Sequence, residues 1–424
     1  MNKLKILHLS TSNEQGGAFI AMQRLHVAMR KAGMDSNVLV LRKHGEYPNT
    51  VQVSKIKFIF ISLITQLQKK WRQRWFGKTK DEYGLFSYAK YGEDVSHYEV
   101  FKQADVVYIH WVSGFLSLRS MNRILKTGKR VVIFLHDMWH ITGGCHYSFE
   151  CNKYETLCNC CQMFKRNKYK DCSYKQFKKK LRMFAKHGNV LFCTPSSWLT
   201  ECTSKSPFAQ NKKVIHITYP LDTSIFKPID KQCARYALNL PIDKKFICFG
   251  AADGTDSPYK GWRYMEEALK IFKKNVNLDA EVLIFGSEYS QAIANKVPFP
   301  VHFTGRLYDY YSLALTYSAV DVYVTPTLAD NLPQTCLEAM ACGIPIVGFN
   351  VGGIPDMVEH AKTGYLAQYK DSSDLAAGIK YVLTHESYEH LSRNAVNKVH
   401  DLAEEVKIAS LHKALLLELK SIFS

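Results

Sequence analysis

The segment Lys5-Ile-Leu-His-Leu-Ser10 is followed by Asn13-Glu-Gln-Gly-Gly17 and by an apolar-periodic stretch over residues 18–32. A buried strand, a glycine turn and a helix in this order are typical of the opening unit of a doubly wound α/β domain. Short Val, Ile and Phe runs then predict further strands over residues 36–41, 105–110, 130–136 and 189–194. Such continuous apolar runs favour a parallel sheet that is covered on both faces.

A second series of strand and helix patterns begins after Pro220. Strands are predicted over residues 245–250, 280–286, 301–305, 321–325 and 345–349, and helices over 262–275 and 334–342. The tail, residues 386–424, has a helical pattern without a strand. We therefore expect two Rossmann-like domains, 1–218 and 219–404, with a C-terminal helix over about 405–424 that crosses back to the first. Two such domains facing a cleft would hold a ligand beyond the carboxyl ends of their strands.

Composition narrows the class of protein. The chain has 424 residues, 46% apolar and 22% charged, which excludes wholesale disorder. No apolar run reaches the roughly 18 residues that a membrane span needs, and no small-residue cleavage site follows the first apolar run. We expect a cytosolic protein.

The charge is concentrated in the first half of the chain. Residues 1–220 contain 36 Lys and Arg against 14 Asp and Glu, whereas residues 221–424 contain 20 against 24. Residues 55–80 carry eight basic residues and no acid, and residues 165–186 carry ten with Asp171 alone opposing them. A field of one sign attracts an anionic partner, such as nucleic acid, anionic lipid or a phosphorylated substrate; general solubility is the simpler alternative.

The segment with the clearest chemistry spans residues 326–345, PTLADNLPQTCLEAMACGIP. Asp330 follows the strand predicted over 321–325, and Glu338 lies eight residues on, inside the next helix. A helix that begins at the carboxyl end of a strand directs free N–H groups at a phosphate. Carboxylates beside it can accept hydrogen bonds from sugar hydroxyls, at about 1.5–3 kcal/mol for each charge-assisted bond. The pattern favours a sugar-nucleotide, although an acid pair alone is also common on solvated helices.

These residues resemble glycosyltransferase family 4, retaining enzymes of the GT-B fold. Asp330-x7-Glu338 with the following Ala-Met-Ala-Cys-Gly-Ile-Pro resembles the paired-acid motif of that family. Further matches are Gly16-Gly17, Lys260-Gly261, Pro220-Leu-Asp222, Gly352-Gly353-Ile-Pro355-Asp356 and Gly364-Tyr-Leu. The segments around His136-Asp137-Met-Trp139 and Thr142-Gly-Gly-Cys145 are similar to enzymes that build capsular, exopolysaccharide or O-antigen chains.

The resemblance implies a role for each matching position. Glu338 would hold the ribose and Asp330 the transferred sugar, while the backbone of Asn331, Leu332 and Thr335 would meet the phosphates. Lys260 would neutralise the departing diphosphate, and Gly16 and Gly17 would let the first loop approach it. His136 would face the reacting sugar. The resemblance implies front-face attack with retention and no catalytic metal.

Two positions depart from the family pattern. The usual first acid is Glu, and Asp330 is shorter. The usual Arg after the first strand of the second domain is absent, because the chain reads Gly250-Ala251-Ala252. Arg263 and Arg306 are the candidates to replace that diphosphate cation.

Five cysteines fall between Cys145 and Cys161. Four thiolates from Cys145, Cys151, Cys158 and Cys161 can close a tetrahedral zinc site, and Cys158-x2-Cys161 suits one knuckle of it. Unligated thiols and disulfides are the alternatives. A zinc ion here would brace a loop and would not catalyse.

The basic stretch 55–80 joins an apolar run to Lys69-Lys-Trp71-Arg-Gln-Arg-Trp75. A basic, Trp-bearing amphipathic segment suits the surface of an anionic membrane, where a lipid-linked acceptor would lie. The alternative is a solvated helix that covers the sheet. We accordingly expect a cytoplasmic enzyme, peripheral at the inner face of the membrane, that moves a sugar from a nucleotide-diphosphate donor to a lipid-linked or oligosaccharide acceptor.

Three other functions would each explain part of the sequence. A dehydrogenase should carry G-x-G-x-x-G after a first strand, and neither domain has it. A nucleic-acid-binding protein would fit the pI of about 9.2 but would leave the acid motif unexplained, so no nucleic acid is expected. A hydrolase or epimerase that acts on sugar-nucleotides stays open.

Overall fold

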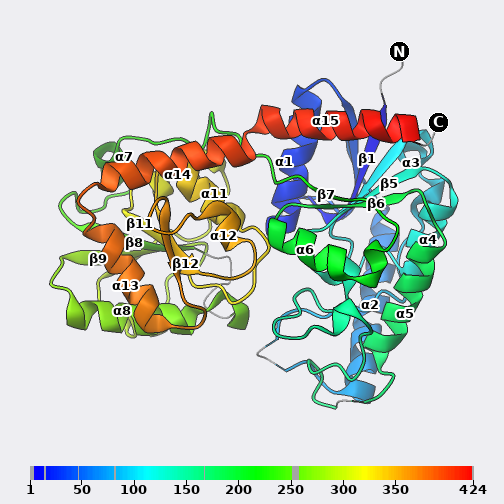
Figure 1. The fold of residues 1–424 in the computed structure, drawn as a ribbon, viewed down its shortest axis with the longest axis horizontal. Helices are drawn as coiled ribbons and strands as arrows, with labels where there is room; N and C mark the ends of the chain where they lie inside the picture. Colours follow the sequence, from blue (N-terminus) through cyan, green and yellow to red (C-terminus); the bar gives the residue numbers. More distant parts are fainter. Residues whose placement is uncertain are drawn as a thin grey trace. The chain divides into compact units, whose positions relative to one another are not determined.

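A computed structural model of the chain describes residues 4–13, 16–45, 47–80, 83–166, 168–250 and 257–422. The chain divides into two compact units (Figure 1). Unit 1 comprises Met1–Pro220 and Val406–Ser424, and unit 2 comprises Leu221–Glu405. No helix in the described ranges is long and apolar enough to cross a bilayer.

Unit 1 is built on a seven-stranded sheet in the order β3-β2-β1-β4-β5-β6-β7, and every strand pair in it is parallel. Its strands are β1 (Lys5–Ser12), β2 (Asp35–Arg42), β3 (Thr50–Gln52), β4 (Val106–Ile109), β5 (Arg130–Phe134), β6 (Val190–Thr194) and β7 (Val214–His216). Its helices are α1 (Gly17–Lys31), α2 (Lys55–Phe76), α3 (Glu99–Gln103), α4 (Leu118–Lys126), α5 (Cys172–Ala185), α6 (Ser197–Lys205) and α15 (Glu405–Ile422). The predicted parallel sheet is confirmed; the edge strands β3 and β7 of this sheet were not predicted.

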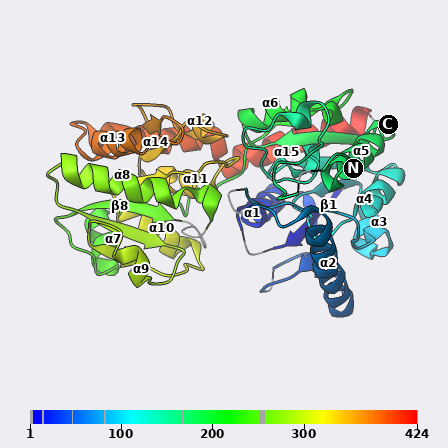
Figure 2. The same ribbon diagram turned by 90° about the horizontal axis from the view of Figure 1, so that it is seen from below.

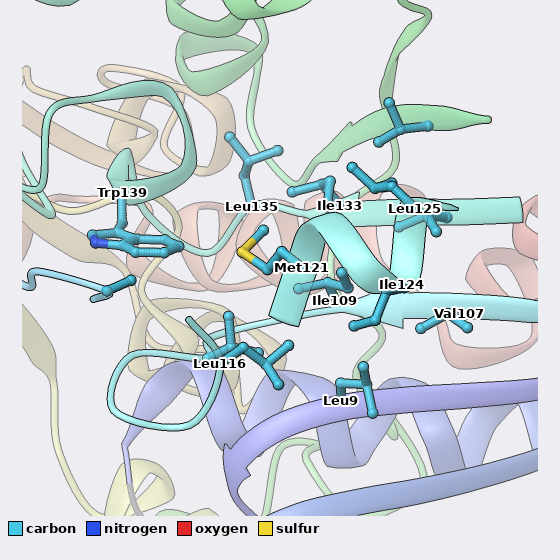
Figure 3. Close-up of a cluster of buried hydrophobic side chains, with 14 of the residues drawn as sticks. Leu9, Val107, Ile109, Leu116, Met121, Ile124, Leu125, Ile133, Leu135 and Trp139 are labelled. Atoms are coloured by element: carbon cyan, nitrogen blue, oxygen red, sulfur yellow. The ribbon is translucent and has the colours of Figure 1, made fainter. Parts of the chain in front are cut away.

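The core of unit 1 lies between the central strands and α4 (Figure 3). The central strands contribute fully buried side chains: Leu9 from β1, Val107 and Ile109 from β4, and Ile133 from β5. Helix α4 adds Met121, Ile124 and Leu125. Trp139 closes this core beyond the carboxyl end of β5. A sheet edge packed in this way holds the loops that follow β1, β4 and β5 in fixed positions.

Unit 2 is a six-stranded parallel sheet in the order β10-β9-β8-β11-β12-β13. Its strands are β8 (Lys245–Gly250), β9 (Ala280–Phe285), β10 (Val301–Phe303), β11 (Val322–Thr325), β12 (Ile346–Phe349) and β13 (Gly364–Ala367). Its helices are α7 (Lys231–Ala237), α8 (Trp262–Asn275), α9 (Gln291–Ala294), α10 (Tyr310–Ser318), α11 (Gln334–Ala341), α12 (Ile354–Met357), α13 (Ser372–Leu383) and α14 (Tyr388–Ala403). Helices lie on both sides of the sheet (Figure 2).

The strand order of each sheet reverses once. In unit 1 the chain runs from β1 outward to β3 and returns at β4, and in unit 2 it runs from β8 outward to β10 and returns at β11. Open parallel sheets bind ligands beside such a reversal, at the carboxyl ends of the strands. The loops after β1, β4, β8 and β11 are therefore the places to look for a site.

Candidate functional site

Lys260 and Asp330 meet at the reversal point of unit 2. Lys260 follows β8 and Asp330 follows β11, and these two strands are neighbours. The Leu328 amide donates to the Tyr259 carbonyl at 2.7 Å, which joins the two loops. The Lys260 ammonium then lies 2.7 Å from Oδ2 of Asp330. Two residues that are seventy positions apart in the sequence thus form one ion pair.

Two glycines permit this packing. Gly261 has φ 73°, and a Cβ there would lie 1.8 Å from the Pro326 carbonyl oxygen. Gly352 has φ 58°, and a Cβ there would lie 2.0 Å from the carbonyl oxygen of Asp330. Any side chain at either position would push apart the loops that carry Lys260 and Asp330.

The ion pair favours the charged form of Lys260. Burial lowers the pKa of Lys260, but the charge of Asp330 and the hydrogen bond to it outweigh burial, so the pKa is raised above its usual value. The Lys260 side chain is 30% exposed and the Asp330 side chain 13%. A half-buried cation beside a carboxylate can exchange that partner for the phosphate of a ligand.

Glu338 lies in α11 and is 3% exposed. Its Oε2 accepts a hydrogen bond of 2.8 Å from the Tyr317 hydroxyl, which projects from α10. The thiol of Cys336 connects this residue to the ion pair: burial raises the pKa of Cys336, the charges of Asp330 and Glu338 raise it further, and Lys260 lowers it. The structure therefore gathers Lys260, Asp330 and Glu338 in one neighbourhood.

Three of the other predicted residues lie at the start of α11, whereas Arg306 and Arg263 lie elsewhere in unit 2. Asn331 and Leu332 are buried, at 1% and 3% exposure, and Thr335 is half-buried in the first turn of α11. Arg306 is exposed in the loop after β10. Arg263 donates to the Tyr264 hydroxyl at 2.8 Å on the surface of α8. Ala251 and Ala252, where the family arginine is missing, lie outside the described residues.

The opposite edge of the same sheet has a large cavity of about 720 Å³ around Asp321. Lys231 and Arg235 each lie 2.7 Å from a carboxylate oxygen of Asp321. This cavity is at the amino end of β11, away from the ion pair. Its volume does not identify it as the donor site, because its buried acid is already paired with two cations.

In unit 1, Gly16 and Gly17 follow β1 at its reversal point. Gly16 caps α1 with φ 97°, and Gly17 is the first residue of that helix. Among the described residues, a Cβ at Gly17 would meet nothing within 4 Å. The packing of these residues therefore does not require glycine at position 17.

His136 ends a chain of buried hydrogen bonds in unit 1. Nδ1 of His8 lies 2.8 Å from Nε2 of His110, and Nδ1 of His110 lies 2.9 Å from Nε2 of His136. Nδ1 of His136 lies 3.0 Å from the Tyr219 hydroxyl. Nε2 of His8 has no hydrogen-bond partner in the described part of the chain, and an unpaired N–H costs more than an unpaired lone pair. We therefore assign the protons to Nδ1 of all three rings.

This chain of rings is uncharged at neutral pH. Burial, with a smaller effect of His140, lowers the pKa of His136 to about 3, although Asp137 opposes the shift. Burial also lowers the pKa values of His8 and His110 well below the usual value. His136 is thus a neutral hydrogen-bonding group, with both ring nitrogens in contact with partners of unit 1.

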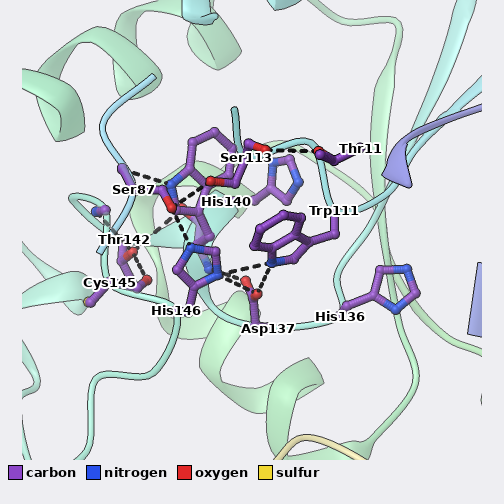
Figure 4. Close-up of polar contacts among 12 residues, drawn as sticks. Thr11, Ser87, Trp111, Ser113, His136, Asp137, His140, Thr142, Cys145 and His146 are labelled. Carbon is purple, nitrogen blue, oxygen red and sulfur yellow. Dashed lines mark hydrogen bonds and ion pairs between the residues drawn. The ribbon is translucent and has the colours of Figure 1, made fainter. Parts of the chain in front are cut away.

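Asp137 organises the loop beside His136 (Figure 4). Its carboxylate lies 2.5 Å from Nδ1 of His146 and accepts from Nε1 of Trp111 at 2.9 Å. Burial alone would raise the pKa of Asp137, but the charge and hydrogen bond of His146 lower it below its usual value. The Thr11 amide donates to the Trp111 carbonyl, so the loops after β1, β4 and β5 are joined.

Lys180 of α5 anchors the same loop from below. It is 1% exposed and donates to the carbonyl oxygens of Trp139 and, at 3.1 Å, Thr142. Its Nζ also lies 3.8 Å from the centre of a Trp139 ring. Burial lowers the pKa of Lys180 to about 7.

The four predicted zinc ligands are all free thiols. Cys158 packs in the main core of unit 1, whereas Cys145 and Cys161 pack on a separate cluster around Phe86 and Phe164. Burial, with the charges of neighbouring thiols, raises the pKa of Cys145 and of Cys158 to about 12. Among the described residues, no group of three or more His, Cys, Asp or Glu could hold a metal ion. Structural zinc thus stays a prediction, which metal analysis of the purified protein would test.

Several residues of these sites were not singled out from the sequence. Tyr317 and Tyr219 are neither charged nor in a motif, and nothing in the sequence indicates their partners. His8 and His110 carried a signal, because each interrupts an apolar strand. Two polar rings buried in neighbouring strands predict a hydrogen bond between them.

Known proteins were compared with the chain. Residues 243–385 match the family model described as Glycosyl transferases group 1. N-acetyl-alpha-D-glucosaminyl L-malate synthase of Bacillus anthracis is 25% identical over 164 residues, which cover 38% of this chain and 43% of that protein. The match thus spans less than half the length of this relative.

The whole chain resembles solved structures in fold. Sucrose-phosphate synthase of Thermosynechococcus elongatus superimposes with a TM-score of 0.66 at 17% identity, over 99% of this chain and 100% of that one. Anabaena Alr3699/HepE in complex with UDP-glucose gives a TM-score of 0.65 at 14% identity, over 98% and 100%. Two Rossmann-like units define the class: this is the GT-B fold, as predicted. The segment that carries Lys260, Asp330 and Glu338 is of the group 1 glycosyltransferase type, so the predicted resemblance is confirmed.

Proposed function

We propose that the protein transfers a sugar from a nucleoside diphosphate to a glycan acceptor with retention of configuration. The ion pair of Lys260 and Asp330 carries this proposal, together with Glu338 in the helix that begins beside it. A cation for the diphosphate and two carboxylates for hydroxyl groups are what such a donor needs.

In this mechanism Lys260 exchanges Asp330 for the diphosphate when the donor binds. Asp330 then accepts hydrogen bonds from the transferred sugar, while Glu338 accepts them from the ribose. Asn331, Leu332 and Thr335 supply backbone N–H groups to the phosphates at the start of α11. As the bond between the anomeric carbon and the phosphate oxygen breaks, Lys260 stabilises the charge that develops on the leaving diphosphate.

Unit 1 is proposed to supply the other groups. Gly17 leaves room for the diphosphate, and the uncharged ring of His136, held by His110 and Tyr219, faces the reacting sugar. The acceptor hydroxyl attacks the anomeric carbon from the face that the diphosphate leaves. Its proton passes to the departing phosphate oxygen, so the step needs no separate base.

We further propose a uridine nucleotide as donor and a lipid-linked glycan at the inner membrane face as acceptor. Support for the donor is that Anabaena Alr3699/HepE was solved with UDP-glucose. Support for the acceptor is the excess of basic residues in residues 1–220 and a fold neighbour, WaaG, described as involved in lipopolysaccharide biosynthesis.

A panel of UDP-, GDP- and ADP-sugars tests the proposal. A true donor binds the folded state and raises the unfolding temperature in a concentration-dependent way. Incubation of that donor with water alone, and with lipid-linked oligosaccharide, separates transfer from hydrolysis and epimerisation, and NMR of the product gives the anomeric configuration. Binding of no nucleotide sugar, or an inverted product, would contradict the proposal.

A further inference from the structure

Helix α2 has one apolar face that the rest of the chain does not cover. Its exposed side chains recur every three or four residues, so they share one face of the helix. They are Ile56 (81% exposed), Ile59 (57%), Phe60 (63%), Leu63 (56%), Leu67 (64%), Trp71 (43%) and Trp75 (52%). We call them the α2 stripe. A helix of 22 residues is about 33 Å long at about 1.5 Å per residue. The stripe is therefore an extended apolar surface and not a set of isolated exposed side chains.

The opposite face of α2 is fixed to unit 1. Ile61 and Phe76 are 7% and 8% exposed. Arg72, at 5% exposure, has its guanidinium carbon 5.3 Å from the ring centres of both Phe86 and Phe164. The helix is therefore held in one orientation, with the stripe turned outward. In Figure 2, α2 extends away from the body of unit 1.

The surroundings of the stripe are basic. No acid occurs in residues 55–80, and Lys69, Lys70 and Arg74 are exposed on the second half of α2. The helix also ends in a basic turn, with Arg74 in its last turn.

A second basic segment lies beside this end of the helix. Thr79 and Phe164 form an antiparallel bridge, and the Arg166 amide donates to the Phe76 carbonyl at 3.0 Å. The guanidinium of Arg166 donates to the Arg74 carbonyl at 3.1 Å. Exposed cations of this segment are Lys165, Arg166, Lys168 and Lys170. The end of α2 and residues 165–170 thus form one cationic surface beside the end of the stripe.

We infer that the α2 stripe and this cationic border dock unit 1 on an anionic lipid bilayer, with α2 lying in the plane of the interface. Ile, Leu and Phe would enter the boundary of the acyl chains, the two Trp would lie at the headgroups, and Lys and Arg would meet lipid phosphates. The inference deepens the proposed function by assigning the membrane contact to a helix outside the donor-binding residues.

A second copy of the chain and a nucleic acid each match only part of this face. A second copy of the chain would bring its own cations against Lys69, Lys70 and Arg74. A nucleic acid would pair with the cations and stack its bases on Phe60, Trp71 and Trp75, but it would leave the four aliphatic side chains of the stripe exposed to water. An anionic bilayer satisfies both features of the surface at once.

Sedimentation of the full chain with vesicles tests the inference. One set of vesicles is phosphatidylcholine alone, and the other is equal parts phosphatidylcholine and phosphatidylglycerol. We expect binding to the anionic set only, weaker at high salt. Leu63→Ser with Leu67→Ser should weaken binding at least tenfold. Lys69→Gln with Lys70→Gln should weaken it about 25-fold, since each basic residue near such a surface contributes about fivefold.

Tyr236→Ser with Ile242→Ser is the matched control, because these side chains are 83% and 52% exposed in unit 2. It should bind vesicles like the natural chain. Equal binding by the stripe variant, or binding to both vesicle sets alike, would overturn the inference. A dimer in solution that the stripe variant dissociates, without vesicle binding, would identify a second copy as the occupant. Nucleotide-sugar binding by each variant is measured in parallel, so that a failed membrane result is told apart from a failed donor site.

Discussion

The carboxyl edges of the two sheets differ in how their polar groups are satisfied. In unit 2 the Lys260 ammonium pairs with the Asp330 carboxylate, and the two side chains stay partly exposed, at 30% and 13%. In unit 1 the rings of His8, His110 and His136 form a buried, uncharged chain of hydrogen bonds that ends on Tyr219.

This difference suits the two sheet edges, each beside its own reversal of strand order, to different roles. An exposed ion pair can give up its partner to a charged ligand at little cost, because the incoming phosphate replaces the carboxylate. A buried neutral network cannot exchange partners so easily, since each bond broken leaves a polar atom unpaired. Unit 2 is therefore suited to bind a charged donor, and unit 1 to hold neutral groups in fixed positions.

The largest effect is expected at Glu338. Glu338→Gln keeps the volume and still accepts from the Tyr317 hydroxyl, but it removes the charge. Loss of two charge-assisted bonds to the donor, at about 1.5–3 kcal/mol each, should reduce turnover of the nucleotide sugar by about 10³-fold. Glu338→Ala should abolish turnover. Thermal unfolding of both variants serves as the control, and normal transfer by a folded Glu338→Ala protein would refute the role.

A smaller loss is expected at the ion pair. Lys260→Met should reduce kcat by about 10²-fold, the effect of removing one group that stabilises developing charge. Lys260→Arg should recover part of it, because a guanidinium also binds phosphate. Transfer rates at saturating donor measure both variants. Lys270→Met is the matched control, since this exposed lysine pairs with Glu266 within α8, and an equal loss there would show that Lys260 has no special role.

The fold, and the grouping of Lys260, Asp330 and Glu338, were largely predictable for physical reasons. The central strands of both sheets are continuous apolar runs, and Asp330, Glu338 and Lys260 sit in motifs whose glycines are required by close approach. Gly261 is an example: a Cβ there would lie 1.8 Å from the Pro326 carbonyl oxygen, so the close packing of the two loops requires glycine at this position. The edge strands β3, β7 and β13 carry no comparable signal, although β10, also an edge strand of three residues, lies inside the segment predicted over 301–305. The start of α15 at Glu405 matches the C-terminal helix predicted over about 405–424.

The network of unit 1 could not be predicted in the same way. His136 was selected from its motif, but its partners His110 and Tyr219 come from other elements, and their pairing depends on strand register. Burial then sets the protonation of these rings. The sequence alone gives neither the depth of a ring nor the direction of its neighbour.

Acid should distinguish the two units next. The lowered pKa values of His8, His26, His110, His136, His140 and His412 all belong to unit 1. A lowered pKa means that the unfolded chain takes up protons first, below about 6.5. Unit 1 should therefore lose stability as the pH falls below about 6.5, and His26 and His140 contribute until about pH 4, to which their pKa values are lowered. Hydrogen exchange at pH 7 and pH 5, corrected for intrinsic rates, should show peptides of unit 1 opening before those of unit 2. Equal opening of both units would contradict the assignment of neutral rings.

The smallest effect is expected at Tyr219. Tyr219→Phe keeps the ring, whose plane is 12° from that of His136 at 5.5 Å, and removes only the hydroxyl that accepts from Nδ1. An unpaired buried N–H costs about 1–3 kcal/mol, which should appear mainly as a lower unfolding temperature, while the transfer rate falls about fivefold. Nucleotide-sugar affinity should not change, because the groups proposed to hold the donor's charge are in unit 2. Isothermal titration and transfer assays on one preparation separate the two quantities. If affinity falls as far as rate, the histidine chain contributes to donor binding, and the division of work between the two sheet edges is wrong.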